Sequence, residues 1–143
     1  MASYVKFYTF VQYLANGSYN CASDTFKVSL SNTAPTASTS TTFSTDITEI
    51  SAGNGYSAGG TAATGNSSSQ SSGTETFALN NVTFTATGTV GPFRYVVLYD
   101  STQSTHNLVA YWDYGSALTL NSGDTFTVQF NGGGSSGTVF TLA

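Results

Sequence analysis

The stretch Phe93-Arg-Tyr-Val-Val-Leu-Tyr-Asp100 decides the fold class, because both of its faces are apolar when the chain is extended. A strand that is buried on both faces lies at the centre of a sheet. Gly91-Pro92 marks its start, and the polar segment after it, 101–107 (STQSTHN), is typical of a hairpin loop. We therefore predict that residues 93–100 form the central core strand.

Apolar and polar residues alternate in further segments on both sides of this strand. In the clearest case Phe26, Val28 and Leu30 would face inward, while Lys27 and Ser29 would face outward. The predicted strands besides 93–100 cover residues 4–13, 24–31, 74–79, 82–86, 108–114, 126–130 and 138–142. Turns are predicted at Asn16-Gly17, at 121–124 and at 132–137, with a tight turn or bulge at Asn80-Asn81.

This pattern predicts an all-β protein. Strands at this spacing, separated by Gly, Asn and Asp turns, indicate one antiparallel β-sandwich domain over residues 1–143. We expect a jelly-roll-like arrangement with long Gly/Ser/Thr-rich loops. The chain has no Gly-X-Gly-X-X-Gly motif and no phosphate-binding loop, and its strands do not alternate with helices, so a nucleotide-binding α/β fold is excluded.

The N-terminal segment 4–13 (YVKFYTFVQY) is dense in aromatic and β-branched residues, and an extended chain would be apolar on both faces. Such a strand is either central in the sheet or lies at a subunit contact. We therefore regard residues 1–16 as a possible contact strand or arm. The candidate residues for a contact with another protein or a second copy are Tyr4, Val5, Phe7, Tyr8, Phe10, Val11, Tyr13 and, from a loop described next, Tyr56.

Two long segments lack strand patterns. Residues 32–44 are rich in Thr, Ser and Pro, and residues 45–50 (TDITEI) predict a short helical turn capped by Ser44 or Thr45. Residues 53–73 carry six glycines and a polar run, with Tyr56 as the only large anchor. A loop of this length is either functional and ordered by a partner, or a mobile surface loop.

Charge and cysteine content exclude several classes of function. Only 7% of residues are charged, against about 25% in an average domain, and the net charge is −4. Three basic residues, Lys6, Lys27 and Arg94, cannot neutralise a run of phosphates, so we expect no nucleic-acid partner. No apolar run is long enough to span a membrane, and no secretory signal is visible. Cys21 alone cannot form an internal disulfide.

The ionisable residues do not suggest an enzyme. His106, the only histidine, falls in a polar loop, where we expect it to be solvated and not part of a catalytic triad. Asp100 and Asp113 lie on adjacent predicted strands and are the best candidates for a glycosidase pair, although turn and surface roles explain them more simply. Calcium at Asp100, Asp113 or Asp124 would need an Asp-rich loop that the chain lacks. We expect no catalytic residues, no metal and no cofactor.

Two further residues have alternative interpretations. Trp112 either packs in the core, which strand periodicity favours, or forms a sugar-stacking platform with nearby tyrosines. Cys21 has no basic neighbour within two positions, so nothing local predicts a reactive thiol. We expect it to behave as a small residue near a loop.

Five stretches taken together resemble small virion structural proteins of tailed bacteriophages, most of all capsid decoration or cement proteins. They are 30–36 (LSNTAPT), 47–60 (ITEISAGNGYSAGG), 91–100 (GPFRYVVLYD), 112–115 (WDYG) and 118–130 (LTLNSGDTFTVQF). The resemblance covers about residues 26–142. It implies a β-sandwich or jelly-roll protein that sits as a dimer or trimer on the capsid, and it brings no catalytic residues.

From this resemblance we expect a non-enzymatic protein on the outer capsid surface of a virion. Its partners would be the major capsid protein and further copies of itself. The alternative is a phage tail, fibre or receptor-binding module that recognises host-surface carbohydrate, since such domains share this Ser/Thr/Gly/aromatic composition. The two hypotheses differ in exposed aromatics, because a decoration protein needs a broad apolar footprint and a lectin needs a small aromatic pocket with polar neighbours.

Overall fold

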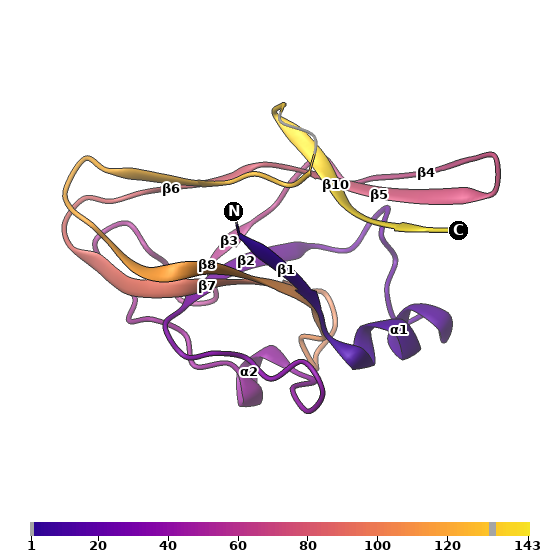
Figure 1. Ribbon diagram of the computed structural model, residues 1–143, viewed down its shortest axis with the longest axis horizontal. Helices are drawn as coiled ribbons and strands as arrows, with labels where there is room; N and C mark the ends of the chain where they lie inside the picture. The colour runs from indigo at the N-terminus through magenta and orange to yellow at the C-terminus, as the bar shows by residue number, and fades with distance from the viewer. Residues whose placement is uncertain (1, 132–133) are drawn as a thin grey trace.

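The computed structural model describes residues 2–131 and 134–143, and antiparallel strands dominate it (Figure 1). The elements in chain order are β1 (Ser3–Lys6), α1 (Tyr8–Ala15), β2 (Phe26–Ser31), α2 (Phe43–Asp46), β3 (Thr61–Ala62), β4 (Ser67–Ser71), β5 (Thr74–Asn80), β6 (Val82–Thr85), β7 (Val90–Asp100), β8 (Leu108–Leu120), β9 (Thr125–Val128) and β10 (Ser136–Leu142). Strands take 49% of the residues and helices 9%, which confirms the predicted all-β class.

The strands form two facing layers, as expected for a β-sandwich. One layer is a five-stranded sheet of order β1-β8-β7-β2-β3, and the other contains the sheet β10-β5-β4 and the pair β6-β9. Figure 1 places β7, β8 and β2 in the lower layer and β5, β6 and β10 above them. The central position of β7 confirms the prediction for residues 93–100, although the strand begins earlier, at Val90. The jelly-roll connectivity is not established by these strand orders and stays a prediction.

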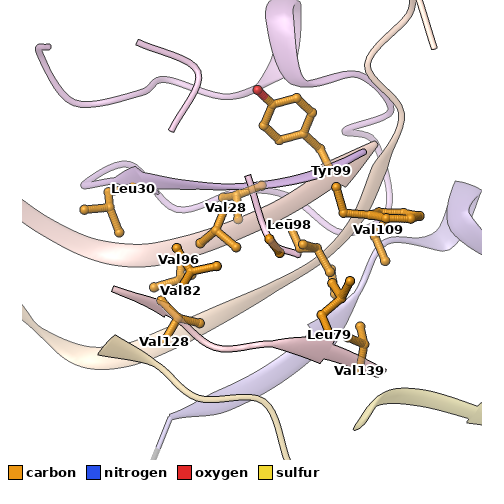
Figure 2. Packing of buried hydrophobic residues seen from close by; sticks show 14 of the residues in the cluster. Val28, Leu30, Leu79, Val82, Val96, Leu98, Tyr99, Val109, Val128 and Val139 are labelled. Carbon is orange, nitrogen blue, oxygen red and sulfur yellow. The ribbon is translucent and has the colours of Figure 1, made fainter. Parts of the chain in front are cut away.

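The hydrophobic core lies between the two layers. Val28, Val96 and Leu98 of the five-stranded sheet point toward Leu79 and Val82 of the facing layer (Figure 2). All five side chains are almost completely buried. The inward residues alternate along each strand, as the sequence pattern predicts. The core therefore holds the two layers together by burial of aliphatic and aromatic side chains.

Part of the opposite face of the five-stranded sheet is buried as well, under α2 and the chain around it. Phe43 of α2 stacks on Tyr99 of β7, with ring centroids 4.0 Å apart and an interplanar angle of 3°. Ser31 donates its hydroxyl to the carbonyl of Thr48 at 2.6 Å. Ser29 was predicted to face outward, but it is 0% exposed. That prediction was wrong because loops cover the face that alternation alone assigns to solvent.

The predicted strand over residues 4–13 is also wrong beyond Lys6. The chain is extended only in β1 and becomes helical in α1. The reason is the spacing of Phe7, Phe10 and Leu14, which puts three large side chains on one helical face and would split them between the two faces of a strand. The helix ends at Asn16, whose N–H donates to the Gln12 carbonyl.

The predicted helical turn over residues 45–50 lies too late in the sequence. The turn is α2, and it begins at Phe43 because burial of this ring against the sheet fixes its start. Asp46 stabilises the turn by accepting hydrogen bonds from the N–H groups of Thr41 and Thr42, at 2.7 and 3.0 Å. Glu49 lies outside the helix, and its carboxylate accepts a hydrogen bond from the Gly59 N–H.

The segment 53–73 is not one continuous loop, since it contains β3 and β4. β4 pairs with β5 along its whole length, and all five of its residues are exposed. Its serine-rich sequence has no apolar alternation, so only the backbone ladder defines the strand. In Figure 1 the β4–β5 hairpin extends away from the body of the protein.

Other turns agree with the sequence pattern. β5 ends at Asn80 and β6 begins at Val82, which confirms the predicted break at the asparagines. At residues 121–124 the Asp124 N–H donates to the Asn121 carbonyl at 3.0 Å. β8 continues to Leu120, beyond its predicted end at 114. Part of the turn predicted over 132–137, residues 132 and 133, lies outside the described residues.

Candidate functional site

The N-terminal segment is fixed to the protein by backbone hydrogen bonds before its helix begins. β1 is the edge strand of the five-stranded sheet and pairs with β8. The Phe7 N–H then donates to the Val109 carbonyl at 3.2 Å, and the Tyr8 N–H donates to the Ala37 carbonyl at 3.0 Å. These bonds place α1 at one end of the sandwich, beside β8 and the 32–44 segment.

The inner face of α1 belongs to the core. Phe10 is 3% exposed, and its ring centroid lies 5.3 Å from that of Tyr19 and 5.1 Å from that of Phe140. Tyr13 and Leu14 are partly buried and pack against the same cluster. This face therefore anchors the helix and is not accessible to a partner.

The outer face of α1 consists of Tyr8, Val11, Gln12 and Ala15, which recur at helical spacing and are all exposed. Tyr8 is 67% exposed and Val11 is 50% exposed. The helix contains no charged residue. Large apolar side chains in water, with no charge among them, are typical of surfaces that contact another protein.

The structure separates the eight predicted contact residues by burial. The exposed ones are Tyr4, Tyr8 and Val11, and the partly buried ones are Val5 and Tyr13. Those with 3% exposure or less are Phe7, Phe10 and Tyr56. The last three are core residues, which corrects their prediction as contacts. They were chosen for their size and apolar character, and these properties suit a core as well as an interface.

Tyr56 points inward and holds its loop on the sheet. Its hydroxyl accepts a hydrogen bond from the Leu30 N–H at 3.0 Å and donates to Glu49 Oε1 at 2.5 Å. The same carboxylate oxygen accepts from the Gly59 N–H at 2.7 Å. Burial of the ring, followed by the Glu49 carboxylate, raises the pKa of Tyr56 above its ordinary value. The phenol therefore stays protonated and serves as a structural donor.

Asp100 and Asp113 do not form a catalytic pair. Asp113 lies opposite Tyr95 in the β7–β8 register, so Asp100 is five residues further along β7, about 17 Å at the rise of a strand. Glycosidase carboxylates lie about 5–10 Å apart. Asp113 instead accepts two hydrogen bonds from Arg94, at 2.7 and 2.9 Å, and these hold its pKa below the ordinary value.

Neither His106 nor Cys21 has the surroundings of a catalytic group. The His106 ring lies beside Tyr99, with centroids 5.9 Å apart, and no hydrogen bond to its ring occurs among the described residues. Burial raises the pKa of the Cys21 thiol to about 11, so it is protonated at neutral pH and weakly nucleophilic. Within residues 2–131 and 134–143 no three His, Cys, Asp or Glu side chains gather to hold a metal ion.

A cleft of about 580 Å³ opens beside β1, and we call it the Trp112 cleft. It is lined by Ala2, Tyr4, Trp112, Gln129, Asn131, Thr138, Val139, Phe140 and Thr141. Sequence analysis assigned Trp112 to the core or to a stacking platform, and the structure places it, partly buried, in the cleft wall. The polar lining residues were missed because they come from β10 and the segment before it, and they carry no motif that connects them with β1.

Comparison with protein-family models, with curated proteins and with solved structures finds no match for this chain. In the described part of the chain no helix has the length and apolar character to cross a membrane. The outer face of α1 and the Trp112 cleft are therefore the features from which a function can be argued.

Proposed function

We propose that the protein is a non-enzymatic structural protein of a tailed-phage virion. In this role it is a decoration protein that binds the major capsid protein on the outer surface of the capsid. The observation that carries the proposal is the outer face of α1, where Tyr8 and Val11 are 67% and 50% exposed on a helix without charges. The sequence resemblance to capsid decoration proteins supports it independently.

The outer face of α1 is suited to a modest contact that is repeated many times. Burying one side chain of the size of Tyr8 or Val11 contributes about 1.5–3 kcal/mol at most, because both are already partly covered. The inner face of α1 is fixed in the core, so little helix entropy is lost on binding. An oligomer that contacts several capsid subunits would gain further through effective concentration.

Capsid stabilisation follows from binding alone and needs no chemistry. A protein that binds adjacent capsid subunits, and binds separated subunits less well, shifts the equilibrium toward the assembled shell. Its charge-poor surface favours association, since weak electrostatic repulsion leaves apolar contacts unopposed.

We further propose that the protein forms homo-oligomers through the free edge of β4. Among the described strands it pairs only with β5, and its five residues Ser67–Ser71 are exposed. Edge strands present unpaired backbone groups, and natural proteins usually protect them with charges or proline. β4 contains neither, so its edge can pair with a second copy.

The test is co-sedimentation of the protein with capsids that lack it, with the molar mass of the free protein measured alongside. We expect saturable binding at lattice stoichiometry and a higher melting temperature of the capsid. The double variant Tyr8→Ser/Val11→Ser should bind at least tenfold more weakly, because the serines remove the apolar contact. Serine has a helix propensity similar to that of Tyr and Val, so the helix should persist.

The matched control is Tyr114→Ser, since Tyr114 is an exposed tyrosine of β8, remote in sequence from α1, and 46% exposed. This variant should bind capsids as the unmodified protein does. Equal binding by the α1 double variant would contradict the role of this face. Retention on host cells without capsid binding would instead assign the protein to the receptor-binding class.

A further inference from the structure

The Trp112 cleft is built from both ends of the chain. Ala2 and Tyr4 come from the N-terminal side, Trp112 from β8, and the opposite wall from residues 129–131 and β10. Its volume of about 580 Å³ lies within the usual range of small-molecule sites, roughly 300–1,000 Å³. A smaller hollow of about 210 Å³ shares Ala2, Trp112 and Gln129 and extends the cleft toward Tyr114.

Two aromatic rings shape one wall of the cleft. Tyr4 and Trp112 lie directly opposite each other in the β1–β8 register, with ring centroids 5.4 Å apart and an interplanar angle of 60°. On another side the Trp112 ring meets Phe130 at 5.7 Å, which fixes its orientation. Tyr4 is 43% exposed, so part of its surface stays open to a ligand. The wall is therefore aromatic and accessible.

Amide and hydroxyl groups complete the cleft. Gln129, Asn131 and Thr141 are exposed, and Thr138 is partly so. The backbone of Asn131 forms two hydrogen bonds with the backbone of Thr138, at 3.2 and 2.6 Å. These bonds hold Asn131 in place without using its side-chain amide. Each amide can donate and accept hydrogen bonds at the same time.

The chemistry of the cleft selects a neutral ligand. None of the described residues that line it carries a charge at neutral pH, and burial raises the pKa of Tyr4, which keeps its phenol neutral. A phosphate or carboxylate ligand would find no cation among these described residues. A purely apolar ligand would leave the amides without partners, which costs free energy. A sugar ring can meet both requirements. Its apolar C–H faces can pack on the aromatic wall, and its rim of hydroxyls can form hydrogen bonds with the amides.

We infer that the Trp112 cleft binds a neutral oligosaccharide. One sugar ring packs against Tyr4 and Trp112, and its hydroxyls bond to the side chains of Gln129 and Asn131. The smaller hollow beside Trp112 provides room for a second sugar unit. This inference does not depend on the proposed capsid role, because the cleft and the outer face of α1 share no residue.

The experiment exploits the single tryptophan of the chain, which lies in the cleft. The protein is first applied to an array of immobilised neutral, sialylated and sulfated oligosaccharides. The free form of each retained glycan is then titrated against the intrinsic fluorescence of Trp112, with acrylamide as a quencher. We expect retention by neutral members, saturable fluorescence change and protection of Trp112 from acrylamide.

Variants connect the binding to the cleft. Tyr4→Ala and Gln129→Ala remove one aromatic and one amide contact at exposed positions, and each should weaken glycan binding at least tenfold. The matched controls are Tyr8→Ala on α1 and Gln103→Ala in the loop between β7 and β8, which make the same chemical changes outside the cleft. Both should bind within twofold of the unmodified protein, and equal melting temperatures would show that all four variants are folded.

Several outcomes would overturn the inference. They are an array with no neutral glycan retained, retention of anionic glycans only, or binding that Tyr4→Ala and Gln129→Ala leave unchanged. Protection of Trp112 by an extended peptide and by no glycan would assign the cleft to strand addition along β10. Because capsid binding is tested through Tyr8 and Val11, failure of one proposal is distinguishable from failure of the other.

Discussion

At the residue scale, the buried Asp100 carboxyl makes a contribution to the stability of the protein that depends on pH. Asp100 is 0% exposed and its Oδ2 has no hydrogen-bond partner. Burial, and then the nearby Asp24 carboxylate, raise its pKa from 3.8 to about 6, against the lowering effect of the Thr102 N–H. Between these values the folded protein binds more protons than the unfolded chain. The protonated Asp100 therefore contributes fully to the free energy of unfolding below about pH 4, and this contribution is lost as the pH rises through 6.

Asp100→Asn should remove this dependence. The variant keeps an acceptor for Thr102 and carries no charge, so we expect its free energy of unfolding at pH 7 to rise by about 1–3 kcal/mol. Urea unfolding at pH 4, 5, 6 and 7 measures the effect, with the exposed Asp124→Asn as control. A variant that still loses stability between pH 4 and 6 as the unmodified protein does would contradict this assignment.

Gly60 is required because the chain passes close to the backbone of β2. Its φ is +74°, and a Cβ at this position would overlap the Val28 carbonyl oxygen. Gly60→Ala should therefore lower the free energy of unfolding by about 3 kcal/mol or more. Gly73→Ala is the matched control, since Gly73 has a φ of +82° and open space around its Cα. It should lose only about 1–2 kcal/mol, the cost of the left-handed conformation.

If the two alanine variants lose equal stability in urea unfolding, the close approach to Val28 contributes nothing. A larger loss for Gly60→Ala would attribute the difference to steric overlap with β2, because both substitutions carry the same conformational cost.

At the scale of elements, α1 has two faces with different effects on stability. Phe10 fills the core, so Phe10→Ala should lower the free energy of unfolding by about 3–5 kcal/mol. Tyr8→Ala on the outer face should change it by less than about 1 kcal/mol. Thermal or urea unfolding of the two variants measures the contrast, and similar losses would contradict the assignment of the faces. Deleting residues 1–13 would remove Phe7 and Phe10 together and should unfold the protein.

For this helix the sequence periodicity does not distinguish a helix from a strand. Tyr8–Ala15 contains aromatic and β-branched residues on all sides, so its composition suggested a strand. The helical spacing of Phe7, Phe10 and Leu14 was present but could not be separated from alternation in so short a segment. By contrast, β2, β6 and β7 were predicted well, because each has a clear apolar pattern with turn residues on both sides. β4 could not be predicted, since serine side chains do not indicate which residues pair.

At the scale of the whole molecule, the candidate sites depend on long-range packing. The sequence predicts an N-terminal contact segment, and the exposed Tyr8 and Val11 lie within it. Burial of Phe7, Phe10 and Tyr56 could not be foreseen, because interfaces and cores draw on the same residue types. The Trp112 cleft joins residues near position 4 with residues near 140. The pairing of β1 with β8 brings Tyr4 to Trp112, and the packing of the two layers brings β10 to both.

The Trp112 cleft is lined by described residues near both ends of the sequence, and this has a practical consequence for display and purification. Ala2 and Thr141 both line the cleft, so a purification tag or cargo domain fused to either end would shield it from large glycans. The tip of the β4–β5 hairpin, at Ser72 and Gly73, is exposed and projects from the body (Figure 1). A peptide inserted there would leave both the cleft and α1 unobstructed, and this makes the hairpin tip the preferred position for an epitope or fluorophore.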